Sequence, residues 1–350
     1  MHMSRKLISS VTAMAAMAAM AVMAALPANA QMTLDELVKK AGEEGIVAMN
    51  TSTTRYPSSA APGLSKAISK KFGIDLEVEF VNSSPVPVIT GQVIKETLAG
   101  VKPSFDVFPL PLFLTVPLSE AGAVETIDWA GIGVDPELID PNGNAVWIHT
   151  IPRAVTYNTD LVEGDDIPTK LEDLLDPKWK GKIAGPGFGG AYGMISVPVL
   201  GEEKASEWLK SLYEDQDLAV IRSMTDVPTR VANGEFSIGM GVPANYSGLV
   251  TKGAPIANAP LEKVGSQPYY MFVLKNAESP NAGALLTYFF CCTQEGKKAQ
   301  LEHMNTAMFD TPGSEQNEVG GDGRGIAPTT EWQLTEQRRV AEALDKLIGR

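Results

Sequence analysis

The chain has few of the residues on which enzyme and metal sites usually depend. Its 350 residues include two cysteines and three histidines. It contains no Gly-x-Ser-x-Gly, His-Glu-x-x-His or Cys-x-x-Cys motif. Because a lone histidine is more often structural than catalytic, the sequence argues against an enzyme and predicts no cofactor.

The two cysteines, Cys291 and Cys292, are neighbours at the end of an apolar stretch that is typical of a buried helix. An even number of cysteines in an exported protein suggests a disulfide. Adjacent residues of a helix, however, do not easily reach the geometry of a bridge. We therefore favour two buried thiols over a vicinal disulfide or a metal site.

Basic residues and long apolar runs are also scarce. The 29 Lys and Arg residues face 42 Asp and Glu residues, a net charge of −13 that argues against a nucleic-acid partner. The apolar run at 11–26 follows Arg5 and Lys6 and precedes the small residues 28–30, the pattern of a signal peptide cleaved after Ala30. The run is shorter than the roughly 20 residues that span a bilayer. We expect a periplasmic protein that starts at Gln31 and has no membrane anchor.

The rest of the chain alternates helical and strand patterns, which favours an α/β fold. Residues 33–36 form a capping box that begins the first helix. Strands are expected at 46–50, 76–81 and 105–108, each followed by a polar loop or a turn. Ligands of open α/β sheets bind at the carboxyl ends of strands, so these loops are predicted to line a binding site.

The loop at 51–59 offers hydroxyl, guanidinium and phenol groups, which can bind oxyanions. Two serines occupy the same place after the second strand. Solvated loops with helix caps are the alternative for both segments. The candidate ligand-binding residues of these loops are Ser52, Thr53, Thr54, Arg55, Tyr56, Ser83 and Ser84.

The glycine-rich turn at 185–190 formally matches the dinucleotide fingerprint. It lies in mid-chain, contains Pro186 and belongs to an exported protein, so a nicotinamide site is not expected. The amides of Gly189 and Gly190 could bind an anion at a helix N-terminus, with Tyr192 one turn beyond. A turn that only packs a helix on a sheet is the equal alternative. A secreted enzyme that uses this turn and His149 is a further hypothesis.

Three segments carry a resemblance to a known family. They read IPRAVTYNTDLV at 151–162 with PKWKGKI at 177–183, VANGEFSIGMG at 231–241, and MFVLKNAESPNAGAL at 271–285. In their order and spacing they resemble periplasmic solute-binding proteins of ABC importers, in the branch that includes the ferric-ion binders.

The resemblance implies the type II periplasmic-binding-protein fold, with two lobes, each a sheet flanked by helices, and a ligand cleft between them. Residues 31–152 and about 272–312 would form lobe 1, and about 153–271 would form lobe 2. The loop and C-terminal helix at 313–350 are not assigned to a lobe. The implied function is capture of a small-molecule ligand by a monomer and its delivery to the membrane permease, without chemistry.

Residues near the expected hinge, at 152–158 and 266–272, complete the predicted site. Arg153 and Tyr157 flank the crossing strand, where Arg153 could clamp a carboxylate or phosphate or pair with an acid at the lobe interface. Thr225 and Asp226 are expected at a helix N-terminus that faces the cleft, with Asp226 more a cap than a ligand group.

Tyrosines bear on the identity of the ligand. Tyr246 falls where the ferric binders carry the first of two adjacent tyrosines, but Ser247 takes the second position. Tyr269 and Tyr270 form a pair on an expected strand, which would place their rings on opposite faces. The hydroxyl and cationic donors at the strand ends predict an anionic organic ligand, a carboxylate or phosphonate, and the tyrosines leave ferric iron held by Tyr246 as the alternative.

Overall fold

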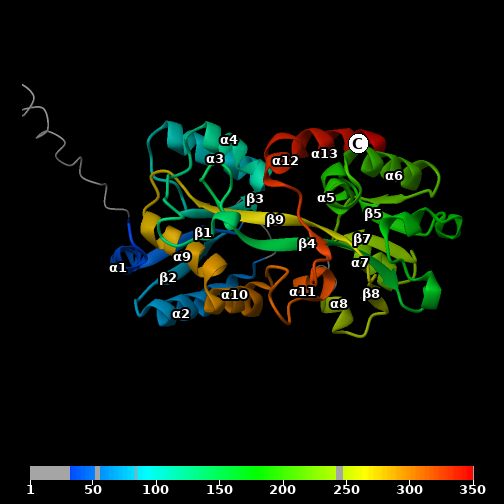
Figure 1. Ribbon diagram of the computed structural model, residues 1–350, viewed down its shortest axis with the longest axis horizontal. Coiled ribbons are helices and arrows are strands. Elements are labelled where there is room, and N and C mark those ends of the chain that lie inside the picture. The colour runs from blue at the N-terminus through cyan, green and yellow to red at the C-terminus, as the bar shows by residue number, and fades with distance from the viewer. Residues whose placement is uncertain (1–31, 52–55, 83–84, 242–246, 350) are drawn as a thin grey trace, which may run out of the picture.

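The computed structural model describes residues 32–51, 56–82, 85–241 and 247–349 (Figure 1). The predicted signal peptide lies outside these residues. Within the described ranges, no helix is both long and apolar enough to cross a membrane. The predicted capping box is present: Thr33 Oγ1 accepts a hydrogen bond from the Glu36 amide at 3.2 Å, and Glu36 Oε2 accepts one from the Thr33 amide at 2.9 Å.

The N-terminal elements alternate as the pattern predicts and form most of the first lobe. They are α1 (Leu34–Glu44), β1 (Ile46–Asn50), α2 (Ala61–Phe72), β2 (Glu77–Val81), α3 (Val86–Leu98), β3 (Val107–Pro111) and α4 (Val116–Glu120). β1 pairs in parallel with both β2 and β3, so the carboxyl ends of these strands meet at one edge of the sheet. α9 (Pro280–Cys292) and α10 (Gln294–Ala299) return to this lobe.

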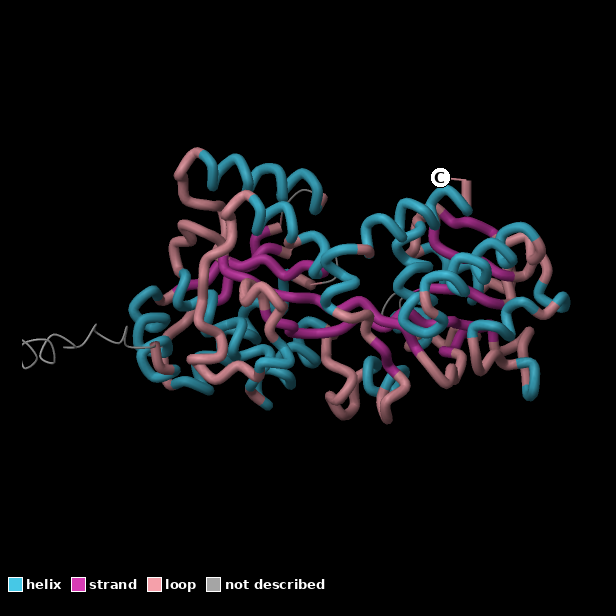
Figure 2. The backbone as a smooth tube through the Cα atoms, turned by 45° about the horizontal axis from the view of Figure 1, so that its top comes forward, coloured by secondary structure: helices cyan, strands magenta, loops and turns pink. Residues whose placement is uncertain are grey.

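Two long antiparallel strands, β4 (Val146–Asn158) and β9 (Val264–Val273), connect the lobes. Their pairing runs from Val146 opposite Met271 to Arg153 opposite Gly265, with a register shift between Trp147 and His149. Over the described residues the sheet has ten strands, in the order β2-β1-β3-β9-β4-β7-β5-β6, with β10 on β9 and β8 on β4. Figure 2 shows two groups of helices and strands joined by these long strands.

The second lobe follows β4. It contains β5 (Ile183–Pro186), α5 (Gly189–Leu200), α6 (Glu202–Glu214), β6 (Ala219–Ile221), α7 (Asp226–Ala232), β7 (Ile238–Gly241), α8 (Ser247–Val250) and β8 (Ile256–Asn258). Its core packs Tyr192, Trp208 and Ile238 together. The first lobe has one core on each face of its sheet, around Phe289 on one face and Phe108 on the other. The lobe boundaries stay a prediction, because β4 and β9 run unbroken through both lobes.

The C-terminal segment contacts both lobes. It comprises α11 (Glu315–Gly320), β10 (Gly325–Ile326), α12 (Thr330–Thr335) and α13 (Gln337–Leu347). Leu334 of α12 packs against the first-lobe core around Phe108. Val340 and Leu344 of α13 belong to the second-lobe core. In Figure 1 these two helices (orange-red and red) lie along the top of the molecule and span its two halves.

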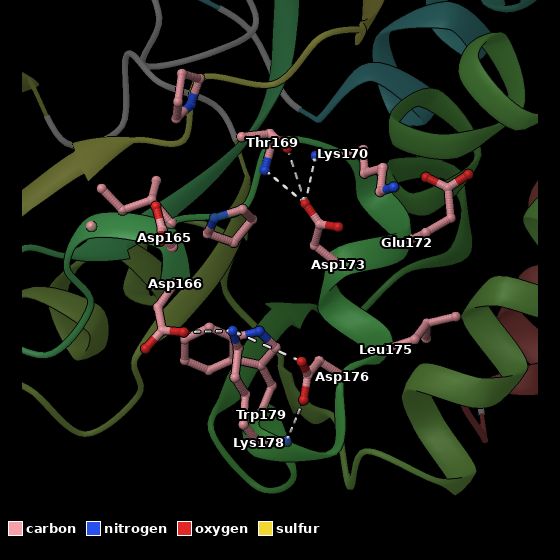
Figure 3. A pocket seen from close by; sticks show the side chains of 14 residues that line it. Asp165, Asp166, Thr169, Lys170, Glu172, Asp173, Leu175, Asp176, Lys178 and Trp179 are labelled. Carbon is pink, nitrogen blue, oxygen red and sulfur yellow. Dashed lines mark hydrogen bonds and ion pairs between the residues drawn. The ribbon is translucent and has the colours of Figure 1, made fainter.

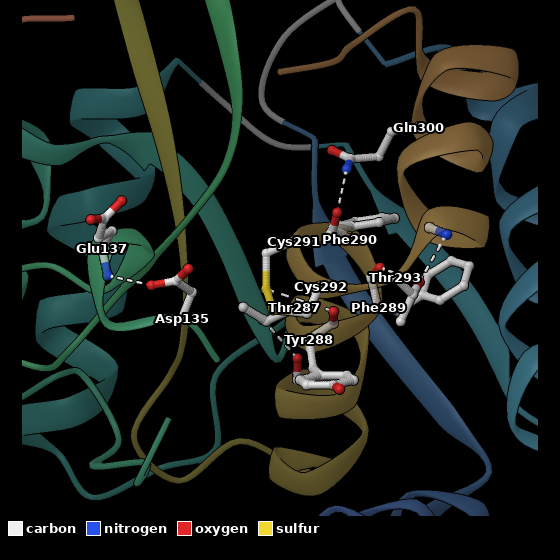
Figure 4. Close-up of a disulfide and its surroundings, with 12 residues drawn as sticks. Asp135, Glu137, Thr287, Tyr288, Phe289, Phe290, Cys291, Cys292, Thr293 and Gln300 are labelled. Atoms are coloured by element: carbon white, nitrogen blue, oxygen red, sulfur yellow. Dashed lines mark hydrogen bonds between the residues drawn. A yellow bond between two sulfur atoms is a disulfide. The ribbon is translucent and has the colours of Figure 1, made fainter. Parts of the chain in front are cut away.

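Cys291 and Cys292 form a vicinal disulfide (Figure 4). The prediction of two free thiols was therefore wrong. The pair lies at the end of α9, and the next residue, Thr293, has an extended backbone with φ −121° and ψ 144°. Because Cys292 is the last helical residue, the bridge is not constrained by a further helical turn.

Candidate ligand-binding site

A small cavity lies at the carboxyl ends of β1 and β3, on the first-lobe side of the expected cleft. Its volume is about 70 Å³. This is the edge at which ligands of open α/β sheets bind. The residues that line it are Asn50, Tyr56, Val86, Pro109, Leu110, Pro111, Leu114 and Tyr269.

Tyr56, His149 and Tyr269 form a group of three rings beside this cavity. Tyr56 Oη and His149 Nε2 share a hydrogen bond of 3.2 Å. The Tyr269 ring lies nearly parallel to the imidazole, with centroids 5.0 Å apart and an angle of 17°. His149 is 0% exposed. The three rings come together through the register of β4 on β9 and through the loop after β1. For this reason only Tyr56 is among the predicted site residues.

The rings of Tyr269 and Tyr270 point to opposite faces of β9, as predicted. Tyr270 stacks on Trp147 at 6.4 Å, on the face away from His149. Burial raises the pKa of the Tyr270 phenol, and the nearby Asp140 carboxylate adds to this shift. The two phenols therefore cannot bind one metal ion together.

Arg153 lies on the crossing strand β4 and reaches toward the second lobe. Its side chain is 8% exposed, and Nη1 lies 3.8 Å from the sulfur of Met224, which follows β6. A second arginine, Arg222, is exposed directly after β6. Arg222 is not among the predicted site residues, although its place after a strand was a usable signal. Arg153 thus contacts Met224 in the segment that follows β6, and Arg222 lies in that same segment.

Thr225 and Asp226 are exposed at the start of α7. Thr225 occupies the cap position, so the prediction of Asp226 as the cap was wrong. Thr225 Oγ1 bonds to Ser223 Oγ at 2.8 Å and does not cap the helix. Tyr157 packs against the second-lobe core, so we assign it to packing rather than to a cleft wall.

The glycine-rich turn is filled by the C-terminal helix. The Gly189 amide donates to Asp345 Oδ1 at 2.5 Å. A Cβ added at Gly189 would lie 2.3 Å from the Ala341 carbonyl oxygen, and α13 also lies in contact distance of Gly190. The carboxylate of Asp345 therefore supplies the negative charge that a helix N-terminus favours.

Tyr192, one turn farther along α5, is 0% exposed within the second-lobe core. Burial raises the pKa of its phenol. The predicted anion site at Gly189, Gly190 and Tyr192 was therefore wrong, and the packing alternative is the one that the structure has.

The PKWKGKI turn forms part of the outer surface of the second lobe, beside a hollow of about 860 Å³ (Figure 3). Lys178 Nζ lies 2.7 Å from Asp166 and 3.8 Å from Asp176, and it stacks over the Trp179 ring at 5.0 Å. The hydrogen bond to Asp166 raises the pKa of Lys178. These contacts stabilise the turn itself, so we assign the PKWKGKI motif a structural role in the second lobe.

Several predicted site residues lie outside the described residues, and their roles stay predictions. They are Ser52, Thr53, Thr54, Arg55, Ser83, Ser84 and Tyr246. Over the part of the chain that the structure describes, no group of three or more His, Cys, Asp and Glu side chains is arranged to hold a metal ion.

Glu315 on α11 lines another pocket, of about 450 Å³, together with Glu318 and residues of α8 and β8. Burial raises the pKa of Glu315 to about 7, and the charge of Glu318 adds to this shift. The folded state thus holds a proton that the unfolded state releases near pH 4.5. By linkage, the free energy of unfolding falls as the pH rises from about 4.5 to 7.

Glu315→Gln is expected to remove the loss of stability that ionisation of Glu315 causes as the pH rises. At pH 8 the variant should be more stable than the parent by on the order of 2 kcal/mol, allowing for the partial exposure of the group. At pH 4 the difference should vanish. Urea unfolding at both pH values measures it, with the exposed Glu331→Gln as the control. An equal difference at both pH values would contradict the raised pKa.

The chain is similar to known proteins in part of its sequence and in its fold. Residues 122–291 match the family of bacterial extracellular solute-binding proteins. Iron-bound HitA from Pseudomonas aeruginosa is 19% identical, with a TM-score of 0.64 over 87% of this chain and 99% of that chain. The substrate-binding protein of an ABC transporter from Agrobacterium tumefaciens is 16% identical, with a TM-score of 0.64 over 87% and 96%.

AfuA from Actinobacillus pleuropneumoniae, solved with fructose-6-phosphate bound, is 19% identical, with a TM-score of 0.55 over 87% of this chain and 96% of that chain. Likeness at this level of identity establishes the fold and leaves the ligand open. The chain is therefore an α/β protein with the two-lobe periplasmic-binding-protein fold, and residues 122–291 are similar to the bacterial extracellular solute-binding proteins.

Proposed function

We propose that this protein captures a small anionic organic solute, a carboxylate or a phosphonate, in the periplasm and delivers it to the permease of an ABC importer. The family match supports solute binding. Similar folds serve an ABC transporter in one neighbour and bind an organic phosphate in another. Catalysis is not part of the proposal, because Asp345 and α13 fill the glycine-rich turn on which the enzyme hypothesis depended.

The observation that carries the anionic ligand is the position of Arg153. It is largely buried on the strand that connects the lobes, and its guanidinium extends to the loop after β6. The planar guanidinium matches carboxylate and phosphonate oxygens in a two-point contact. Arg222 adds a second positive charge after the same strand.

The arrangement favours a hinge mechanism. Tyr56 and Tyr269 lie on the first-lobe side of the proposed cleft, and Arg153 and Arg222 lie toward the second lobe. An anion that contacts both sides would favour the closed arrangement through bending of β4 and β9. The permease would then receive the closed, loaded protein.

Arg153→Ala is expected to weaken the binding of the anionic ligand by on the order of 100-fold, because a buried charge contact is lost. Arg153→Lys should recover part of the affinity through its charge. Protein freed of ligand by unfolding and refolding would be screened by thermal shift with carboxylates, phosphonates, sugars, polyamines and ferric ion, followed by calorimetry. Arg230→Ala is the matched control, since Arg230 on α7 pairs at 2.9 Å with Glu235, which follows that helix. Stabilisation by sugars or polyamines alone would overturn the proposal.

Ferric iron is the second candidate. It is favoured by the iron-bound neighbour and by the two phenols, Tyr56 and Tyr269, that line the same cavity. A visible tyrosinate-to-iron charge-transfer band on addition of ferric ion would support iron over the organic anion. A colourless protein with no metal uptake would reject it.

A further inference from the structure

The disulfide of Cys291 and Cys292 closes the smallest ring that two cysteines of one chain can form, because the two residues are adjacent. In the loop-entropy account, a disulfide stabilises the folded state by restricting the unfolded chain, and this contribution shrinks with the loop. The bridge therefore adds little as a link between distant parts of the fold. Its effect is local, at the end of α9 (Figure 4).

The bridge and a regular helix require different positions of the two side chains. Successive side chains of an α-helix point about 100° apart, whereas a bridge needs Cβ atoms about 3.5–4.5 Å apart. The oxidised pair therefore opposes continuation of α9, which ends at Cys292 with Thr293 extended. Without the bridge, the Thr293 amide could bond to the Phe289 carbonyl oxygen, as in a longer helix.

In the oxidised protein, the side chain of Thr293 joins α9 to α10. Its Oγ1 donates to the Phe289 carbonyl oxygen at 2.7 Å and accepts from the Gly296 amide at 2.9 Å. Gln300 Nε2 donates to the Phe290 carbonyl oxygen at 3.0 Å. A Cβ added at Gly296 would overlap the Phe289 carbonyl oxygen. The first turn of α10 therefore lies directly on the end of α9.

The segment after α10 attaches to the connecting strand β4. α10 runs into a π-helical turn, η8 (Gln300–Met304), and the chain then reaches Ala307. The Ala307 carbonyl oxygen accepts from the Thr150 amide of β4 at 3.0 Å. The neighbour of Thr150 is His149, one of the three rings beside the candidate site. One continuous segment, 293–307, thus joins the end of α9 to the surroundings of that site.

The surroundings of the two cysteines admit the reduced pair as well as the bridge. Cys292 is half-buried, whereas Cys291 is 4% exposed, so a thiol from solution reaches the sulfur of Cys292 first. Cys291 Sγ lies 3.6 Å from the Tyr288 carbonyl oxygen, within reach of an S–H donor. A reduced Cys291 would therefore keep a partner within the first-lobe core.

We propose that Cys291 and Cys292 form a redox-active site, whose opening loosens the segment 293–307 and its contact with β4. The chemistry is exchange with a dithiol. One thiolate of the dithiol attacks Sγ of Cys292 and forms a mixed disulfide, and Cys291 leaves as a thiolate that takes up a proton. The second thiol then displaces Cys292. The dithiol is oxidised to a disulfide, and the protein gains two electrons and two protons.

Hydrogen exchange read by mass spectrometry tests this proposal on protein purified without reductant. Alkylation followed by intact mass should count no free thiol at first and two after treatment with dithiothreitol. On reduction, peptides that cover 293–307 and 146–151 are expected to exchange on the order of tenfold faster, because local opening becomes easier. Peptides of α6 in the second lobe should not change. The unfolding midpoint should shift by about 3 °C or less.

The double variant with Cys291→Ser and Cys292→Ser is the matched control. It lacks the bridge, so its segment 293–307 should exchange like that of the reduced parent, with or without dithiothreitol. Reoxidation of the reduced parent with oxidised glutathione should restore slow exchange, so the test does not depend on the folding of the variant.

Three results would each overturn the proposal: two free thiols in the protein as purified, equal exchange before and after reduction, or an equal acceleration in α6. The measurement needs no solute, so its outcome is independent of the proposed function.

Discussion

Gly265→Ala is expected to destabilise the protein by about 3 kcal/mol or more, because the new methyl group would overlap a helix backbone. Gly265 lies on β9 opposite Arg153, where α5 crosses the strand. A Cβ at this position would lie 2.1 Å from the carbonyl oxygen of Met194 and 2.7 Å from that of Ile195. Backbone atoms cannot rotate away as a side chain can, so α5 must move off the sheet.

Gly241→Ala in β7 is the matched control. Among the described residues, no atom outside its chain neighbours lies within 4 Å of a Cβ added there, and its φ is not in the left-handed region. Its effect should stay within about 0.5 kcal/mol. Urea unfolding followed by tryptophan fluorescence measures both variants. Equal midpoints for the two would show that α5 does not pack on Gly265 as described.

Asp106→Ala should cost about 3 kcal/mol through the loss of two backbone hydrogen bonds. Asp106 is 4% exposed, and its carboxylate joins two distant segments of the first lobe. Oδ2 accepts from the Ala48 amide of β1 at 2.8 Å, and Oδ1 accepts from the Ser279 amide before α9 at 3.0 Å. Each buried amide left without a partner costs about 1–3 kcal/mol.

Two further variants separate this linking role from a simple loss of charge. Asp106→Asn keeps one oxygen acceptor and should fall between the parent and Asp106→Ala. Asp135→Ala removes an exposed carboxylate that accepts from the Glu137 amide at 2.9 Å (Figure 4), and should cost about 1 kcal/mol or less. Thermal and urea unfolding measure all three variants. A cost for Asp106→Ala no larger than that for Asp135→Ala would contradict the linking role.

Local signals in the sequence predicted local structure well. The capping box at Thr33, the strands of the first lobe and the opposite directions of Tyr269 and Tyr270 follow from short-range spacing, and the structure confirms them. Strand alternation and helix capping depend on residues a few positions apart. The resemblance supplied the two-lobe fold, which the comparisons confirm.

The error at Gly189 arose because its partner lies far away in the chain. The amide of Gly189 was predicted to bind a ligand, but its partner, Asp345, is 156 residues later. The hydrogen bond of His149 with Tyr56 joins residues 93 apart, and no sequence motif indicates it. Whether a helix terminus meets a ligand or another helix is decided by tertiary packing, which a single sequence does not reveal through local spacing.

The C-terminal segment adds a third span between the lobes, beside β4 and β9. Two adjacent strands alone would let one lobe bend toward the other and also rotate about the axis of the strands. Leu334 of α12 packs on the first-lobe core, Trp332 of α12 and the helix α13 pack on the second-lobe core, and β10 pairs with β9. An attachment away from that axis resists rotation, so bending disturbs the fewest contacts. On the proposed function, closure by bending alone would give the two walls of the cleft the same relative orientation each time, whatever solute is enclosed.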